Sequence, residues 1–336
     1  MRPLRILHKS VPCLCTENLL MIGNTMQHIN LRPEKPADIR GQVVVLGYFD
    51  GVHTAHRHLI ELARARADES GTGVMVWTFS YLSKSGKGSL TTRDEKTELF
   101  RTYGVDSVVF EDFSDFRDLD GETFFTRYIA DRLSPSAILC GYNFRFGRGA
   151  AWGASELSSL SQASSVPCIV ADEFTIDGIT VSSTAIRDLL AAGDTEAANR
   201  MLGYEYSVTS EIEHGKMIGR TMGIPTINQT VPADKFRPAC GVYAVRCGFP
   251  ETGETYDGVA NLGYRPTVSL NRGKITLETH LFGYSGAAYG SVVRTSFLKK
   301  IRDEIRFPDK TSLSEQIRKD EETAFLYFKD CADEKN

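Results

Sequence analysis

The stretch VVVLGYFDGVHTAH, residues 43–56, decides the fold of the first half of the chain. Its first four residues are apolar and predict a buried strand, and the apolar residues after it recur on one face of a helix. Glycines mark the turn between them, where backbone N–H groups and the positive end of a helix can approach a phosphate. His53 and His56 lie three residues apart at the helix start, so both can point toward one anion. Two solvated histidines on a surface helix are the alternative, which the strand, glycines and spacing together disfavour.

Length and composition describe an ordinary globular protein of two domains. A chain of 336 residues exceeds the size at which a single core usually keeps growing. The net charge of −4 argues against a surface that coats nucleic acid, and no apolar run approaches the roughly 20 residues that span a bilayer. The seven cysteines are scattered without a C-x-x-C pair. We interpret them as reduced thiols of a cytoplasmic protein, with neither nucleic acid nor membrane as a partner.

Residues 1–40 fit neither domain. Basic residues and a short apolar run weakly suggest a signal peptide, but polar residues interrupt the run. This segment can also be explained by a start codon assigned too far upstream, with Met26 as the alternative start. A poorly ordered extension is a further explanation. Residues 1–25 are therefore expected to be dispensable.

The pattern of apolar and turn-forming residues changes near residue 203. Before about residue 180, strands alternate with helices, which predicts a mainly parallel, helix-covered sheet that binds ligands at the carboxyl ends of its strands. After Gly203, short β-branched and aromatic runs between Gly and Pro predict a small antiparallel barrel, followed by one helix with a capping box at Ser312 and Glu315. We expect an extension at 1–40, domains at 41–186 and 204–330, and a helical linker at 187–203.

Two further segments of the first half suit a phosphorylated ligand. The run SSTAIR, residues 182–187, places hydroxyls at a helix start, where they can cap N–H groups or hold phosphate oxygens, and Arg187 adds a matching fork. The run GYNFRFGR, residues 141–148, combines a tight glycine turn with flat apolar and cationic side chains. Taken alone, a helix cap and two core phenylalanines explain these segments as well.

The second half carries the run GKMIGRTMGIPTIN, residues 215–228. Its closely spaced glycines suit a loop that lies over a nucleotide. Thr226 and Asn228 alternate, so their oxygens face the same side of an extended segment. Hard oxygen ligands of this kind suit Mg²⁺, although an isolated Thr-x-Asn is more often part of a turn.

These motifs together resemble the bacterial bifunctional riboflavin kinase/FAD synthetase family. The first-half motifs are similar to GxFDGxHxGH, GxDFxFG and SSTxxR of its adenylyltransferase module, and residues 215–228 are similar to the flavokinase signature. The segments 240–244, 258–267 and 277–282 agree in order, so the likeness covers about residues 41–328. It implies a Rossmann-like nucleotidyltransferase domain and a small antiparallel β-barrel flavokinase domain with a terminal helix. The sequence departs from the family pattern at Ala55, Asn143 and Ser80-Tyr81.

The resemblance implies two reactions: ATP-dependent phosphorylation of riboflavin to FMN, and adenylylation of FMN to FAD with release of pyrophosphate. Mg²⁺ is the implied metal, ATP is the co-substrate, and riboflavin and FMN are the other partners. In the first half, the implied ATP-binding residues are Gly47, Phe49, Asp50, Gly51, His53, His56, Ser183, Thr184 and Arg187, with both histidines catalytic. A loop that contacts FMN or the adenylyl group comprises Asn143, Phe144, Arg145 and Phe146.

For the second half, the resemblance implies an ATP-binding set of Gly215, Lys216, Gly219, Arg220, Gly223, Pro225, Thr226 and Asn228. Thr226 and Asn228 would hold the metal. Glu278 would accept the proton of the riboflavin 5′-hydroxyl. Tyr264, Arg265 and Arg302 are the implied flavin-binding residues.

Three other functions stay open at this point. The departures at Ala55, Asn143 and Ser80-Tyr81 suit a monofunctional riboflavin kinase with a drifted adenylyltransferase half. The first half could also transfer an adenylyl or cytidylyl group to another phosphorylated acceptor. A flavin-binding regulator without turnover is the third, and the sequence leaves the oligomeric state undetermined.

Overall fold

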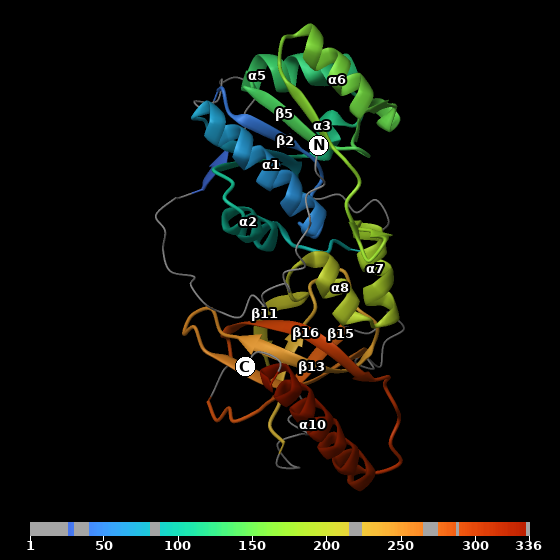
Figure 1. The fold of residues 1–336 in the computed structure, drawn as a ribbon. Coiled ribbons are helices and arrows are strands. Elements are labelled where there is room, and N and C mark those ends of the chain that lie inside the picture. Colours follow the sequence, from blue (N-terminus) through green and yellow to red (C-terminus); the bar gives the residue numbers. More distant parts are fainter. Residues whose placement is uncertain are drawn as a thin grey trace.

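The computed structural model describes residues 26–29, 40–80, 88–214, 224–264, 275–286 and 289–333. A helix-covered sheet occupies one end of the molecule and a closed barrel the other, with two short helices between them (Figure 1). This arrangement confirms the predicted fold class. No helix of the described residues is long and apolar enough to cross a membrane.

The first half is built around a six-stranded sheet in which every pairing is parallel. In spatial order its strands are β1 (Gln27–Ile29), β4 (Ser107–Glu111), β3 (Val74–Phe79), β2 (Val43–Leu46), β5 (Ala137–Gly141) and β8 (Cys168–Ala171). Its helices are α1 (Thr54–Ser70), α2 (Arg93–Thr102), α3 (Phe113–Phe116), α4 (Gly121–Thr123), the π-helical η1 (Phe124–Ala130), α5 (Asp131–Leu133) and α6 (Ala154–Ala163). The short elements β6 (Arg145–Phe146), η2 (Arg148–Ala150), β7 (Trp152–Gly153), β9 (Thr175–Ile176) and β10 (Ile179–Thr180) complete it.

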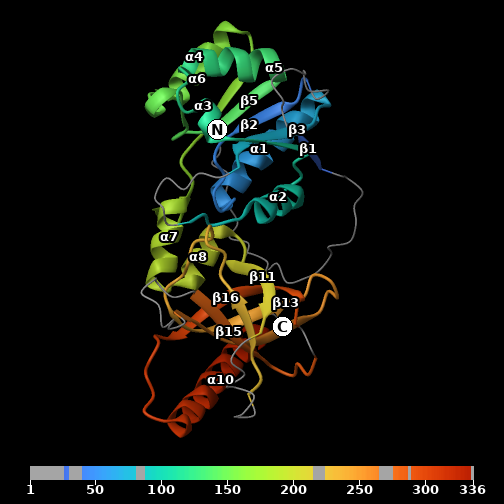
Figure 2. The same ribbon diagram turned by 180° about the vertical axis from the view of Figure 1, so that it is seen from behind.

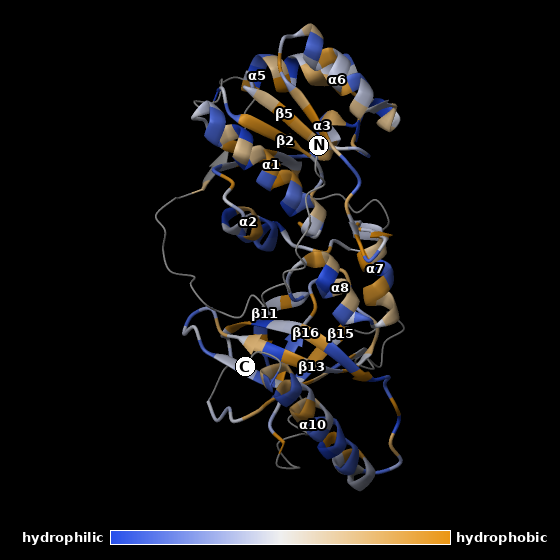
Figure 3. Ribbon diagram, in the orientation of Figure 1, coloured by the Kyte–Doolittle hydropathy of each residue, from blue (hydrophilic) through white to orange (hydrophobic). Residues whose placement is uncertain are grey.

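Both faces of this sheet are covered, which explains why its central strands are continuously apolar (Figure 3). Val43 and Val45 of β2 pack with Leu59 and Ile60 of α1 on one face. The alternate residues of β2 pack on the opposite face against the α3–α6 layer, which Figure 2 shows from behind. The parallel pairings of β2 with β3 and β5 set its direction, so its carboxyl end lies at the same edge of the sheet as theirs.

The strand order reverses at β2, which has β3 on one side and β5 on the other. In register, Leu46 is paired with Cys140, so the segments that follow β2 and β5 start side by side. A crevice at such a reversal is the usual ligand site of a parallel α/β sheet. The histidine turn, residues 47–56, and the loop after Gly141 both begin there.

The second half is a closed antiparallel barrel. Around the barrel the strands are β11 (Ser207–Glu213), β12 (Ile227–Thr230), β15 (Ile275–Leu281), β14 (Thr255–Tyr264), β13 (Gly241–Gly248) and β16 (Val292–Arg302). The terminal helix α10 (Lys310–Asp333) packs Ala324 against Val242, Ala244 and Val259 on the outer face.

Helices α7 (Ser183–Ala192) and α8 (Thr195–Leu202) connect the halves and share the core of the barrel. Leu190 and Leu202 belong to the same buried cluster as Tyr206, Tyr243 and Phe297. The connection is therefore a packed layer on the barrel, visible between sheet and barrel in Figure 1.

Two local predictions were wrong. Residues 27–29 pair with β4 and Met26 is buried in the core cluster that covers one face of the sheet, so residues 26–29 belong to the sheet and not to the predicted extension. At the terminal helix, the Asp309 carboxylate accepts the Ser312 N–H at 2.8 Å, so Asp309 provides the cap that was assigned to Ser312. Helix α10 starts at Lys310, before Ser312. The backbone N–H groups of its first turn, which have no acceptor within the helix, therefore lie next to Asp309.

Candidate active sites

The histidine turn is a tight, strained connection held by hydrogen bonds from distant segments. Phe49 and Val52 have φ of 54° and 36°, and Gly51 between them has φ of 81°. A positive φ at a residue other than glycine costs about 1 kcal/mol or more, and such residues cluster at functional sites. The Gly51 N–H donates to Thr91 Oγ1 at 3.2 Å, and the Tyr204 hydroxyl donates to Gly51 O at 2.6 Å. Distant residues thus hold the turn in this conformation.

The two histidines form a stacked, uncharged pair at the start of α1. Their ring centroids lie 3.6 Å apart with an interplanar angle of 16°. Burial lowers the pKa of His53 to about 3, and burial together with electrostatic repulsion from His53 and Lys96 lowers the pKa of His56 well below 6.5. Neither Nδ1 has a hydrogen-bond partner among the described residues, although both are enclosed. Because enclosed polar atoms normally have partners, this pair suits an incoming phosphate.

Asp50 brings the SSTAIR run to this turn. Arg187 forms an ion pair with the Asp50 carboxylate, and Ser183 Oγ donates to Asp50 O at 2.8 Å. Ser182 caps α7 through the Ala185 N–H, whereas Thr184 is exposed. Arg187 Nε is enclosed without a partner among the described residues. In this structure Ser183 and Arg187 form hydrogen bonds to other parts of the protein, Arg187 through both of its Nη atoms.

The loop after β5 contains both core and exposed residues. Phe146 is 6% exposed and packs in the core against Trp152, with ring centroids 5.9 Å apart. Phe144 is half-buried and stacks on Phe146 at 5.7 Å, while Asn143 and Arg145 are exposed. Phe146 therefore supports the loop, and Asn143, Phe144 and Arg145 remain accessible beside it.

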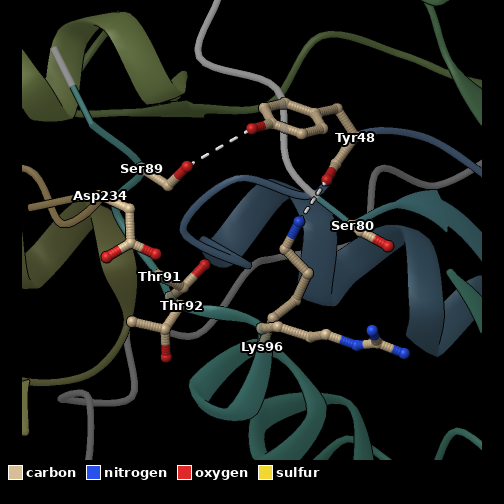
Figure 4. Close-up of a pocket in the computed structure, with 8 residues that line it drawn as sticks. Tyr48, Ser80, Ser89, Thr91, Thr92, Lys96 and Asp234 are labelled. Atoms are coloured by element: carbon tan, nitrogen blue, oxygen red, sulfur yellow. Dashed lines mark hydrogen bonds between the residues drawn. The ribbon is translucent and has the colours of Figure 1, made fainter. Parts of the chain in front are cut away.

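The structure adds Lys96, which sequence reasoning missed. Its side chain is 3% exposed, and its ammonium donates to Tyr48 O at 2.9 Å and lies 4.7 Å from the centre of the Tyr48 ring (Figure 4). Burial lowers its pKa to about 8, against the opposing effect of Asp50. A cavity of about 330 Å³ opens beside it. The sequence could have indicated that Lys96 is buried, because it lies four residues before the buried Phe100 and so on the same inward-facing side of α2.

In the barrel, Asn228, Glu278 and Asn261 occupy paired positions on adjacent strands. Asn228 lies opposite Glu278 in the β12–β15 ladder, and Glu278 lies opposite Asn261 in the β15–β14 ladder. Directly paired residues project from the same face with Cβ atoms about 5 Å apart. His280 Nδ1 lies 2.9 Å from Pro225 O, which fixes the backbone just before Thr226.

The side-chain atoms that could bind a metal at this barrel face are oxygens. Thr226 is half-buried, Asn228 is 7% exposed and Glu278 is exposed. Hydroxyl, amide and carboxylate oxygens are the ligands that Mg²⁺ accepts alongside substrate phosphates. No group of three or more His, Cys, Asp or Glu residues that could hold a metal occurs within the described ranges.

The remaining predicted residues of the second half lie apart or outside the described ranges. Arg302 forms a two-pronged ion pair with Asp320 of α10, at 2.9 Å through Nε and 2.7 Å through Nη2, which fastens the terminal helix. Tyr264 is exposed at the end of β14. Gly215, Lys216, Gly219, Arg220, Gly223 and Arg265 lie outside the described residues.

A short segment joins the two halves at the histidine turn. The Ser89 N–H donates to Asp234 O at 2.7 Å, and the Phe236 N–H donates to Ser89 O at 2.8 Å. Lys235 and Glu95 form an ion pair beside this bridge, with side-chain exposures of 2% and 11%. Leu90, which follows Ser89 in the chain, donates its N–H to the Asp50 carboxylate at 2.8 Å. Residues before the barrel strand β13 thus support the turn that carries the histidines.

Lys235→Met is expected to lower the free energy of unfolding by about 3 kcal/mol, because it leaves the buried Glu95 carboxylate without its counter-ion. Denaturant unfolding measures this change. Lys299→Met is the matched control, since Lys299 is 47% exposed and lies 3.9 Å from Glu196, a surface pair worth about 1 kcal/mol or less. Equal, small changes in both variants would contradict this account of the bridge.

Comparisons with known proteins agree with both sites. A family model described as riboflavin kinase matches residues 202–328, and one described as FAD synthetase matches residues 35–185. A bifunctional riboflavin kinase/FMN adenylyltransferase of Haemophilus influenzae is 33% identical over 299 residues, covering 86% of this chain and 95% of that protein. Proteins of the same name are 32% identical in Bacillus subtilis, covering 85% and 92%, and 33% identical in Escherichia coli K12, covering 86% and 93%.

A crystal structure described as a macrolide-efflux protein from Streptococcus pneumoniae has a TM-score of 0.80 to this chain at 26% identity, covering 88% of this chain and 98% of that one. Its fold is shared with this chain over both halves. The two family models and the relatives confirm the resemblance drawn from the motifs. The chain belongs to the family of bifunctional riboflavin kinase/FMN adenylyltransferases.

Proposed function

We propose that this chain converts riboflavin to FMN in its barrel half and FMN to FAD in its sheet half, with ATP as co-substrate of both. One observation carries the proposal: both family models match a single chain, each over a half that has its own polar site. We assign residues 41–186 to the adenylyltransferase domain, 187–203 to the helical connection and 204–330 to the kinase domain.

The departures at Ala55 and Asn143 do not favour a drifted first half, and Tyr81 of the third departure lies outside the described residues. Ala55 lies within α1 and is not among the residues of positive φ, so its extra methyl group causes no backbone strain. Asn143 is exposed at the carboxyl edge of the sheet, where its amide can still accept or donate a hydrogen bond.

In the sheet half, a phosphate oxygen of FMN attacks the α-phosphorus of ATP, and the bond to the bridging oxygen breaks to release pyrophosphate. His53 and His56 donate hydrogen bonds to the charge that develops on the transferred and leaving phosphates. Their low pKa values mean that they enter the reaction uncharged, and the incoming phosphate charge favours their protonation. Ser183, Thr184 and Arg187 contact the β- and γ-phosphates.

In the barrel half, Glu278 accepts the proton of the riboflavin 5′-hydroxyl, whose oxygen then attacks the γ-phosphorus of ATP and displaces ADP. Thr226 and Asn228 would hold Mg²⁺, which neutralises phosphate charge when bound. The pairing of Asn228 with Glu278 supports this assignment, because the phosphate end and the hydroxyl end of the reaction would then meet on one barrel face. Positioning is the main contribution, because phosphoryl transfer asks for little covalent chemistry from the protein.

A cytoplasmic location suits this function. ATP is consumed in both reactions, and the cysteines of the described residues, from Cys140 to Cys331, are free thiols.

Asn228→Ala is expected to lower FMN formation from riboflavin by more than about 100-fold, since the metal loses a ligand on the barrel face. FAD formation from supplied FMN in the same preparation serves as the control and should stay within about twofold of wild type. Chromatographic separation of the flavins measures both rates. Parallel loss of both reactions would contradict separate sites.

His56→Ala is expected to have the reverse effect, with FAD formation falling by about 100-fold because one donor to the developing charge is removed. His58→Ala is the matched control, since His58 lies on the same helix and contacts the Phe174 ring at 5.5 Å. A His56→Ala enzyme that makes FAD at the wild-type rate would remove this histidine from the mechanism.

A further inference from the structure

Most of the side chains that line the cavity beside the histidine turn can bind an anion, and the carboxylate of Asp234 also lines it. Hydroxyls of Ser80, Ser89, Thr91 and Thr92 face it, and Lys96 closes one wall (Figure 4). Its volume of about 330 Å³ is enough for a phosphate group together with part of the molecule that carries it. The cavity lies next to the turn because Tyr48 lines it as well.

Lys96 has no carboxylate partner of its own within the part of the chain that the structure describes. Asp50 is paired with Arg187 and accepts from Leu90 N, and Glu95 is paired with Lys235. The single acceptor that Lys96 reaches there is Tyr48 O, so two of its three donors remain available. A buried ammonium normally has an anionic partner. The anion that fits here is one that enters the cavity.

The position of Lys96 connects this anion to the transfer reaction. Its contact Tyr48 follows Gly47, and the Lys96 charge is felt at His56. A phosphate held by Lys96 would therefore lie beside the turn and close to the phosphates that the histidines contact.

We propose that Lys96 is a further substrate-binding residue of the adenylyltransferase site, whose ammonium binds a phosphate oxygen of the substrate occupying this cavity. The inference rests on the proposed function of the sheet half. The phosphate is that of FMN or one of those of ATP, and the two sources predict different kinetic effects.

The test uses the full chain with Lys96→Met, which keeps the length of the side chain and removes its charge. Initial rates of FAD formation give KM for FMN at saturating ATP and KM for ATP at saturating FMN. We expect one of these KM values to rise about 10- to 100-fold, as for loss of a charge-assisted hydrogen bond. A rise for FMN identifies the FMN phosphate, and a rise for ATP identifies the nucleotide. Two unchanged KM values would overturn the proposal.

Riboflavin phosphorylation by the same variant reports whether the chain is folded, because Lys96 belongs to α2 of the sheet half and Glu278 to β15 of the barrel half. Lys299→Met controls for the substitution itself. A wild-type chain that forms no FAD would refute the proposed function, a result separate from the comparison of variants.

The pH dependence keeps the proposal testable even if Lys96→Met does not fold. Burial lowers the pKa of Lys96 to about 8, so the charged form is lost as pH rises above that value. The groups that face it are Tyr48 and Asp50 of the turn, His56 of α1, Arg93 of its own helix and Asp234 from the barrel half. We expect kcat/KM of wild type to fall above pH 8, and Lys96→Arg to remove that fall because Arg stays charged. A wild-type profile that is flat from pH 7 to 9.5 would overturn the proposal.

Discussion

The buried carboxylate of Asp50 is the constraint on which the sheet-half site depends. It is 2% exposed and receives the Leu90 N–H on one oxygen and the Arg187 guanidinium on the other. A buried charge is stable only when it is paired and hydrogen-bonded, so Asp50 requires both partners. Their presence holds together the histidine turn, the segment after residue 88 and the start of α7. The strained backbone at Phe49 and Val52 persists because these contacts over-determine it.

The same set of contacts reaches the barrel. Ser89 forms a backbone bridge to the stretch that contains Lys235, and the Glu95–Lys235 ion pair lies beside it. The connecting helices also contribute Leu190 and Leu202 to the barrel core. The halves are therefore packed against one another through polar and apolar contacts, while their two sites lie on separate surfaces: the carboxyl edge of the sheet and the outer face of the barrel.

Local patterns predicted the parts of the fold that depend on local burial. Strand β2 was predicted with its observed bounds, because both of its faces are covered and every residue is apolar. Strand β1 was missed, since three residues at a sheet edge leave no periodic signal. The Asp50–Arg187 pair joins residues 137 positions apart, and no spacing rule connects them. The position of Asn228 opposite Glu278 likewise depends on the strand register in the closed barrel, which the sequence does not show. Lys96 was overlooked because a lysine is normally expected at the surface.

The central claim is that one chain carries two working sites that act in sequence. The most direct measurement incubates the purified protein with riboflavin, ATP and Mg²⁺ and follows riboflavin, FMN and FAD by chromatography over time. We expect FMN to appear first and FAD to follow as FMN is consumed. Accumulation of FMN without FAD, even after fresh ATP and FMN are added, would contradict this claim.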